Sequence, residues 1–286
     1  MPPQHPLAWI TGANGLIGRC LVQAASECAP QWRVRALTWV DFDLTDFTAA
    51  KREFDRDQPQ LIIHCAAMTI VADAQKNPGL AWRVNVGATR FLAELAAEIP
   101  FVFFSTDLVF DGRKGNYVET SAVNPLHVYG ETKAAAEKFV LQNPRHLVLR
   151  TSINAGTTAT GRAFNEQLRR SFQTAGQGMK LFTDEFRCPI AAVETARAAW
   201  ELVQKNVAGI FHVAGAEKLS RWQIGQLLVT RWPEIKTRLE PGSARDFPGP
   251  PRALDVSLDI SKAQKILSRP LPAFTDWLAA NPEELC

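Results

Sequence analysis

Tyr129 and Lys133 lie four residues apart in the segment Tyr-Gly-Glu-Thr-Lys, a spacing that places both side chains on one face of a helix. An ammonium group beside a phenol lowers the pKa of the phenol, normally about 10, so that the phenol can exchange protons near neutral pH. Such a pair suits a tyrosine acting as acid or base on a carbonyl or alcohol. The same spacing also occurs in ordinary exposed helix starts, so the surrounding sequence has to decide.

Two hydroxyl groups precede this pair at the end of an apolar segment. Residues 101–107 read Phe-Val-Phe-Phe-Ser-Thr-Asp, which predicts a buried strand that delivers Ser105 and Thr106 to its carboxyl end. Doubly wound sheets bind their ligands at that end of their strands. The alternative is that the hydroxyls only form a turn.

A glycine-rich turn lies near the N-terminus. The apolar run 7–10 leads into Thr-Gly-Ala-Asn-Gly-Leu-Ile-Gly (11–18) and an amphipathic segment to about Cys28, which predicts the strand, turn and helix that begin a dinucleotide-binding unit. A backbone without Cβ atoms can approach a pyrophosphate, and the helix start supplies free N–H groups. The spacing is Gly-x-x-Gly-x-x-Gly rather than Gly-x-Gly-x-x-Gly, so a turn without a ligand is the alternative. The candidate cofactor residues are Gly12, Asn14, Gly15, Leu16, Ile17 and Gly18.

The second predicted strand, 32–38, ends where a dinucleotide site distinguishes its two cofactors. A carboxylate there binds the ribose 2′-OH, whereas an arginine accommodates a 2′-phosphate. The first acid after the strand is Asp41, so no acid is expected at the strand tip, and Arg19, Arg33 and Arg35 are nearby. The sequence therefore favours NADP(H), with NAD(H) as the alternative. The expected cofactor contacts here are Thr38, Asp43 and Leu44, with Asp43 as the candidate for an adenine contact.

A third strand is predicted over 61–67, Leu-Ile-Ile-His-Cys-Ala-Ala. Its small terminal residues would let a ligand lie across the edge of the sheet. His64 lies inside the apolar run, so we expect a hydrogen-bonded core histidine rather than a catalytic one. The further candidate cofactor residues are Cys65, Ala66, Ala67 and Ser105.

Length and composition restrict the class of protein. A chain of 286 residues exceeds the usual single core, so one large α/β unit with an appended lobe is expected. A net charge of +3 with dispersed basic residues gives no reason to expect a nucleic-acid or membrane partner. The five cysteines form no CxxC pair and no metal-like cluster, so we expect reduced thiols, no metal and a cytoplasmic protein. No signal-peptide pattern and no long apolar run is present.

Three blocks together resemble the extended short-chain dehydrogenase/reductases, and within them the dTDP-4-dehydrorhamnose reductase group: 11–18, 105–112 and 129–133. Segments 64–69, 82–86 and 149–152 support the resemblance, which covers about the first 150 residues. It implies an α/β fold with a doubly wound parallel sheet of the Rossmann type and a smaller α/β C-terminal substrate lobe. The expected sheet domain is 1–150 with 186–214 returning to it, and the expected lobe is 151–185 with 215–286.

The resemblance also implies roles for single residues. Tyr129 would protonate a keto oxygen as a hydride arrives, and Lys133 would lower the pKa of Tyr129 and hold the nicotinamide ribose. Thr106 would hydrogen-bond the keto oxygen, and Asn85 would support a water-linked proton path to Lys133. Gly12, Gly15 and Gly18 would cradle the pyrophosphate. The implied activity is an NAD(P)H-dependent reduction of a keto group on a nucleotide-linked deoxysugar.

The substrate side departs from this family. Ile153 begins a run that replaces a Trp-Val-Tyr-like one, Ala72 stands where an acid is usual, and Glu185 and Arg187 replace Gln and Gly. These changes suggest a different substrate or a repurposed pocket. Arg187 could bind a pyrophosphate or carboxylate, or form a surface salt bridge. Arg252 could meet a phosphate after a proline-rich loop, 241–251, that is a candidate lid. The candidate substrate residues are Thr69, Val71, Thr106, Asn154, Arg187 and Arg252.

Two alternatives remain open. One is an epimerase or dehydratase of the same superfamily, although Leu108 stands where a dehydratase carries its second acid. The other is a non-catalytic cofactor-binding subunit that regulates a partner. The intact Tyr129, Lys133 and Thr106 argue against the second alternative, and a homodimer is left open.

Overall fold

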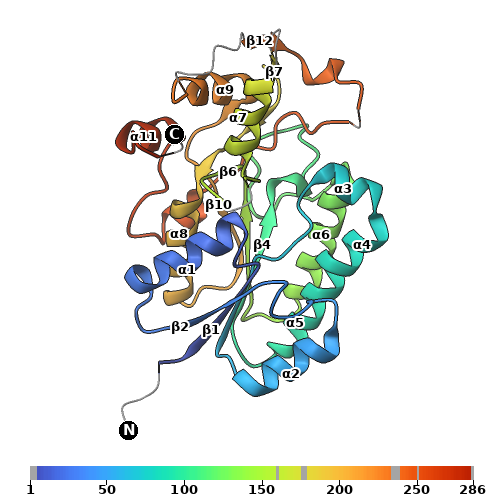
Figure 1. The fold of residues 1–286 in the computed structure, drawn as a ribbon, viewed down its shortest axis with the longest axis vertical. Helices are drawn as coiled ribbons and strands as arrows, with labels where there is room; N and C mark the ends of the chain where they lie inside the picture. The colour runs from blue at the N-terminus through green and yellow to red at the C-terminus, as the bar shows by residue number, and fades with distance from the viewer. Residues whose placement is uncertain (1–4, 159–160, 175–178, 233–238, 250, 285–286) are drawn as a thin grey trace.

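A parallel sheet of six strands forms the centre of the computed structural model, which describes residues 5–158, 161–174, 179–232, 239–249 and 251–284. The strand order is β10-β5-β4-β3-β1-β2 (Figure 1). Because β2 and β3 lie on opposite sides of β1, the winding reverses there, at the point where doubly wound sheets bind ligands. The expected α/β fold is confirmed. The strands are β1 Leu7–Thr11, β2 Arg33–Leu37, β3 Leu61–His64, β4 Phe101–Thr106, β5 Leu147–Thr151 and β10 Gly209–Val213.

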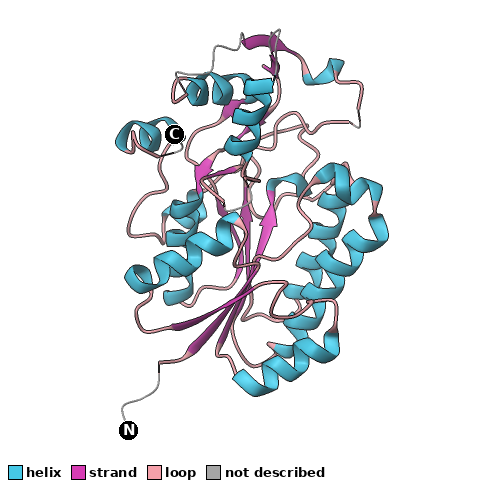
Figure 2. Cartoon of the chain, in the orientation of Figure 1, coloured by secondary structure: helices cyan, strands magenta, loops and turns pink. Residues whose placement is uncertain are grey.

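Helices cover both faces of this sheet (Figure 2). Successive strand residues point to opposite faces, so in β1 the side chains of Ala8 and Ile10 join one core cluster and Trp9 joins the other. The first cluster includes α1 (Leu16–Cys28) and α8 (Ala192–Gln204). The second includes α2 (Phe47–Asp57), α5 (Thr89–Leu95) and α6 (Val128–Val140).

The helical segment before β4 is not one regular α-helix. It begins with α4 (Pro78–Trp82), continues as a π-helix over Arg83–Ala88, and ends with α5. Pro78 suits the first helical position because its missing N–H needs no partner there. π-Helical turns are rare and often occur at functional sites. Here the π-helix contains Asn85, a candidate site residue.

Among the described residues, the smaller lobe contains three helices and short strand pairs. Its core includes Leu168, Phe172, Ile224 and Trp232, all buried. The segment 239–249 is more ordered than the predicted loop: β12 (Leu239–Gly242) pairs with β7 (Met179–Phe182), and a 3-10 turn follows over Ala244–Asp246. Pro250 lies outside the described residues. The other elements of this region are α7 Phe164–Thr174, α9 Arg221–Val229, α11 Phe274–Ala280, β6 Asn154–Ala155, β9 Ile190–Ala191, β8 Phe186–Arg187 and β11 Leu219–Ser220.

Two short helices complete the described fold: α3 (Val71–Lys76), and α10 (Ser261–Gln264), which packs near β10. Ala263 and Leu267 belong to the core cluster of the main sheet, so part of the C-terminal segment packs on the sheet. The domain boundaries stay a prediction. None of the described helices combines the length and the apolar character needed to cross a membrane.

Candidate active site

The glycine-rich turn has a backbone that favours glycine at Gly12. Its φ is +66°, and a Cβ atom there would lie 2.7 Å from the amide nitrogen of Ala66 in the segment after β3. A Cβ at Gly18 would collide with the carbonyl oxygen of Gly12. Gly15 precedes α1 and provides no side-chain cap, so the first N–H groups of α1 are available to an anion. The turn therefore fits a pyrophosphate.

An acid lies at the tip of β2, contrary to expectation. The carboxylate of Asp41 accepts hydrogen bonds from the backbone N–H of Thr38 (2.8 Å) and from its hydroxyl (2.9 Å). These two hydrogen bonds lower the pKa of Asp41. The chain turns back on itself after the strand, which counting residues along the sequence does not show.

The arginines near β2 differ in what they can reach. Arg33 begins the strand and donates to the carbonyl of His5, at the opposite end from the cofactor edge. Arg35 forms ion pairs with Glu53 and Asp57. Of the three arginines considered, Arg19 is the one that follows the glycine-rich turn directly, in the first turn of α1.

Tyr129 and Thr106 come together at the carboxyl ends of the sheet. Helix α6 begins after His127, whose Nδ1 accepts a hydrogen bond from the N–H of Gly130 (3.2 Å). Tyr129 is 8% exposed, and its phenol lies close enough to the Thr106 hydroxyl for that hydroxyl to lower the pKa of the phenol in part. Burial raises the pKa of Tyr129 above its ordinary value. Desolvation of the phenol is the largest cause of this shift, and the tuning of Tyr129 by Lys133 stays a prediction.

Lys133 lies one turn further along α6 and is also buried, at 3% exposed. Its ammonium nitrogen stands 3.9 Å from the centre of the Phe103 ring. Burial lowers the pKa of Lys133 to about 7, although the Glu137 carboxylate opposes this shift. A lysine with such a pKa can take up or release a proton near neutral pH.

Glu137, one turn beyond Lys133, ties this helix to the sheet and was missed from the sequence. Its carboxylate accepts a hydrogen bond from Ser105 (2.5 Å) and forms an ion pair with Arg150 (2.7 Å). Ser105, a candidate cofactor residue, is therefore held by the protein. The spacing of Tyr129, Lys133 and Glu137, four residues each, was the signal available.

Asn85 joins the π-helix, the segment after β3 and α6 through its amide. It accepts from the N–H of Met68 (2.7 Å) and donates to the carbonyl of Met68 (3.1 Å) and to the hydroxyl of Thr132 (2.9 Å). Its side chain thus positions α6. The water-linked proton path stays a prediction.

His64 is a core histidine, as expected. Its ring nitrogens contact the hydroxyls of Thr11 (2.6 Å) and Thr89 (3.0 Å), and burial lowers its pKa to about 3.

Four charged side chains, which we call the Glu185 cluster, meet on the substrate side, and two of them, Glu185 and Arg187, are buried. The Glu185 carboxylate is 0% exposed and contacts Arg187 (3.0 Å), Arg221 (2.9 Å) and Arg252 (3.1 Å). Burial by itself would raise the pKa of Glu185, but the three arginines outweigh it and lower the pKa to about 2. The surface salt bridge considered for Arg187 is wrong, because Arg187 is 4% exposed. Arg221 was missed from the sequence.

The Glu185 cluster continues to the catalytic candidates through Asp107. Arg187 lies 3.9 Å from the carboxylate of Asp107, which accepts hydrogen bonds from Thr106 (3.1 Å) and Ser152 (2.6 Å). Burial raises the pKa of Asp107. The structure therefore brings Thr106, Tyr129 and Arg187 into one connected network.

The remaining candidates lie at the edges of this region. Asn154 uses its amide to contact Thr195 (2.7 Å) and Thr151 (2.9 Å), and Thr69 is exposed. Asp43 accepts hydrogen bonds from the N–H and hydroxyl of Thr45 (2.8 and 2.9 Å). The half-buried candidates are Leu44, Cys65, Ala66, Ala67 and Val71.

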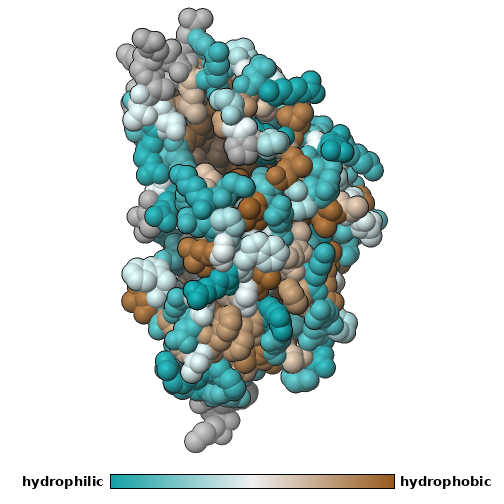
Figure 3. Space-filling model, turned by 90° about the vertical axis from the view of Figure 1, so that its right-hand side faces the viewer, coloured by the Kyte–Doolittle hydropathy of each residue, from teal (hydrophilic) through white to brown (hydrophobic). Residues whose placement is uncertain are grey.

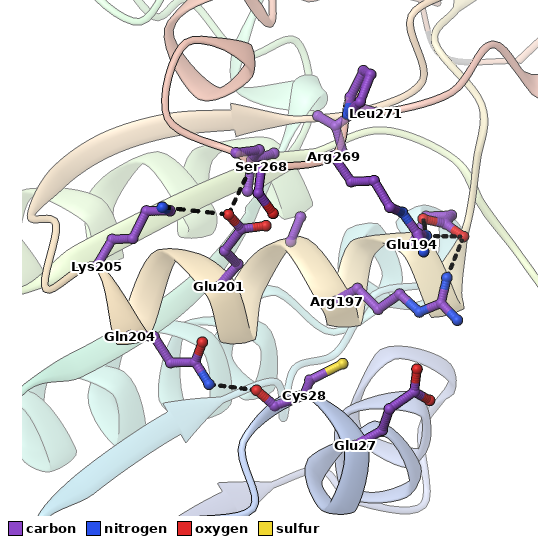
Figure 4. A pocket seen from close by; sticks show the side chains of 13 residues that line it. Glu27, Cys28, Glu194, Arg197, Glu201, Gln204, Lys205, Ser268, Arg269 and Leu271 are labelled. Carbon is purple, nitrogen blue, oxygen red and sulfur yellow. Dashed lines mark hydrogen bonds and ion pairs between the residues drawn. The ribbon is translucent and has the colours of Figure 1, made fainter.

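The surface of the molecule is hollowed in more than one place. Figure 3 shows the face over α3 to α6, with a hollow in its upper half. Elsewhere a cavity of about 540 Å³ lies between α1, α8 and residues 267–271. In that cavity Glu194 pairs with Arg197 and Arg269, and Glu201 pairs with Lys205 (Figure 4), so we assign it no catalytic role. Within the described residues, no cluster of three or more His, Cys, Asp and Glu side chains could hold a metal ion.

Residues 8–285 match the family model described as RmlD substrate binding domain. The chain belongs to this RmlD family. The match confirms the resemblance to the dTDP-4-dehydrorhamnose reductase group.

Individual relatives of this RmlD chain differ in what they are named for. It is 32% identical over 289 residues to the probable low-salt glycan biosynthesis reductase Agl14 of Haloferax volcanii, covering 96% of both chains. It is 30% identical over 282 residues to methionine adenosyltransferase 2 subunit beta of Xenopus laevis, covering 91% of this chain and 82% of that one. The solved dTDP-4-dehydrorhamnose reductase of Bacillus anthracis, in complex with NADP, has a TM-score of 0.87 at 23% identity, over 96% of this chain and 98% of that one. This last likeness shows the fold.

Proposed function

We propose that this RmlD-family chain is an NAD(P)H-dependent reductase of a keto group on a nucleotide-linked deoxysugar. The observation that carries the proposal is the meeting of the buried side chains of Tyr129 and Thr106 at the carboxyl end of β4, one helical turn from the buried Lys133. These groups lie at the edge of the sheet that also carries the glycine-rich turn. The similarity to the reductase of Haloferax volcanii supports a reductive reaction.

Reduction of a ketone adds a hydride to the carbonyl carbon and a proton to the carbonyl oxygen. The bound dinucleotide supplies the hydride. Tyr129 gives its phenolic proton to the oxygen, and the hydroxyl of Thr106 hydrogen-bonds the same oxygen as negative charge develops on it. Because burial raises the pKa of Tyr129, the phenol is protonated at neutral pH, as a proton donor must be. Lys133, whose pKa is about 7, then returns a proton to the phenolate.

The dinucleotide is NADP(H) in this proposal, with NAD(H) as the alternative. Arg19 lies next to the glycine-rich turn, where it can meet a 2′-phosphate, and the Bacillus anthracis reductase was solved with NADP. The Asp41 carboxylate at the tip of β2 is the observation that favours NAD(H), because it can accept a hydrogen bond from a ribose 2′-OH. Direct titration with both nucleotides decides between them.

The substrate side carries a surplus of positive charge that suits the diphosphate of a nucleotide sugar. Three guanidinium groups of the Glu185 cluster face two carboxylates, those of Glu185 and Asp107. The side chain of Arg221 is 20% exposed and that of Arg252 is 30% exposed. Arginine pairs well with phosphate oxygens, so these two are the proposed diphosphate contacts, and Arg187 holds the cluster to Asp107.

The second candidate function is a non-catalytic subunit that binds the dinucleotide and regulates a partner. The similarity to methionine adenosyltransferase 2 subunit beta favours it. In that case Tyr129 would have no reacting oxygen to protonate.

The experiment is NADPH and NADH oxidation with a dTDP-4-keto-6-deoxy sugar, for the wild type and Tyr129→Phe. The variant should lose about 10²–10⁴-fold in rate, the usual contribution of a positioned acid, and should retain dinucleotide binding. Tight dinucleotide binding without reduction of any ketone tested would favour the regulatory subunit. Equal rates for the two proteins would remove Tyr129 from the mechanism.

A further inference from the structure

A tryptophan is held in solvent at the tip of β2. Trp39 is 78% exposed and its neighbour Val40 is 75% exposed. The turn that presents them is fixed, because the Asp41 carboxylate binds the N–H and hydroxyl of Thr38, and the N–H of Asp41 donates to the Thr38 carbonyl (3.1 Å). The turn thus exposes two adjacent apolar side chains on a backbone that hydrogen bonds hold in place.

The position of this turn suggests a role for Trp39. The N–H of Ala13, inside the glycine-rich turn, donates to the carbonyl of Leu37 (3.1 Å), the last residue of β2. Trp39 therefore follows by two residues a strand end that touches the pyrophosphate cradle. In dinucleotide-binding sheets, this strand end meets the adenosine half of the cofactor.

Asp43, the polar side chain expected to contact the adenine, is hydrogen-bonded within the protein. Asp43 binds Thr45 through its carboxylate at 2.8 and 2.9 Å, which shapes the turn before α2. Trp39 is the most exposed of the large apolar side chains in the described residues, and it lies beside the strand end where the base is expected. Bases stack on aromatic side chains whatever their hydrogen-bonding edge.

We propose that Trp39 is the adenine-stacking residue of the dinucleotide site and that the hydrogen bonds of Asp41 to Thr38 position it. The proposal rests on the proposed function only for the presence of a dinucleotide. It makes no claim about the ketone, so the two can fail separately.

The test is equilibrium binding of ADP, NADPH and NADH to the full chain, by calorimetry or ligand fluorescence, for the wild type, Trp39→Ala, Trp39→Phe and Val40→Ala. ADP carries the adenosine half without nicotinamide. Trp39→Ala should weaken all three ligands by about tenfold, within the range measured for base stacking. Trp39→Phe should recover most of the affinity, and Val40→Ala, a matched change in the same exposed turn, should shift it less than about twofold.

Several outcomes would overturn the proposal. One is unchanged affinity of Trp39→Ala for ADP, and another is an equal loss in Val40→Ala, which would indicate general damage to the turn. A third is absence of ADP and dinucleotide binding in the wild type. A fourth is a change in oligomeric state of Trp39→Ala with nucleotide affinity intact, which would assign Trp39 to a protein contact. Loss of ADP binding in Trp39→Ala would support it even if no ketone is reduced.

Discussion

Arg150 binds Glu137 through two hydrogen bonds, Nε to Oε1 at 3.0 Å and Nη2 to Oε2 at 2.7 Å. Both side chains are buried. Since Arg150 belongs to β5 and Glu137 to α6, this ion pair fixes the helix that carries Tyr129 and Lys133 against the sheet that carries Thr106.

Breaking this pair should cost stability. Glu137→Gln leaves the Arg150 charge buried without its partner, so the free energy of unfolding should fall by about 3–5 kcal/mol, measured by urea denaturation. The matched control is Glu94→Gln, which breaks the exposed pair with Arg90 and should change the value by less than about 0.5 kcal/mol. Equal effects of the two changes would show that the buried pair has no special role.

The lowered pKa of Lys133 should make stability depend on pH. Above about pH 7 the folded chain has lost the Lys133 proton, whereas the unfolded chain keeps it up to about pH 10. The unfolded state then binds more protons, so raising the pH stabilises the fold by up to about 1.4 kcal/mol per pH unit. The unfolding free energy of the wild type minus that of Lys133→Met should therefore increase from pH 7 to pH 9. A difference that stays constant over this range would contradict the shift.

Gly12 and Gly79 should respond in opposite ways to alanine. Gly12→Ala places a Cβ against the Ala66 backbone at a φ of +66°, so it should cost about 1–3 kcal/mol and abolish dinucleotide binding. Gly79 lies exposed in α4 with open space around it. Gly79→Ala should stabilise the chain by about 0.5–1 kcal/mol and leave binding unchanged. Thermal melts measure the stability of both variants, and NADPH titration measures their binding. A Gly12→Ala variant that binds NADPH normally would exclude the glycine-rich turn as the pyrophosphate site.

Asp41→Asn should shift the choice of dinucleotide. The amide oxygen can still accept from Thr38, so the turn is kept, while the negative charge is removed. A 2′-phosphate is repelled by a carboxylate at this position, so the ratio of NADPH affinity to NADH affinity should rise severalfold. Titration with both nucleotides measures the ratio, and no change would place Asp41 away from the ribose.

Local patterns predicted the sheet and the position of its ligand edge. Short apolar runs followed by glycine or small residues mark buried parallel strands, and the spacing of Tyr129 and Lys133 fixes their shared helix face. These features depend on neighbours within a few residues, so they can be derived from the chain itself. The same holds for His64, whose apolar surroundings predicted a core position.

The remaining features depend on contacts between distant segments or on burial. Glu185 and Arg252 are 67 residues apart, so their ion pair cannot be inferred from spacing. The pKa of Tyr129 was predicted to fall because a lysine is close, yet desolvation raises it, and burial depends on the complete fold. Asp41 lies four residues after the last residue of β2, so the sequence predicted no acid at the strand tip. The chain turns there, however, and the Asp41 carboxylate accepts a hydrogen bond from the N–H of Thr38.

The Glu185 cluster has a consequence for how this sequence can diverge. Its carboxylate compensates arginines from β8, α9 and the segment at 252, so loss of any one charge unbalances a group that includes the buried Glu185 and Arg187. Single replacements at Glu185, Arg187, Arg221 or Arg252 should therefore be rejected, whereas joint replacements can be tolerated. In an alignment of relatives these four positions should change together, and a relative that lacks Glu185 should also lack at least two of the arginines.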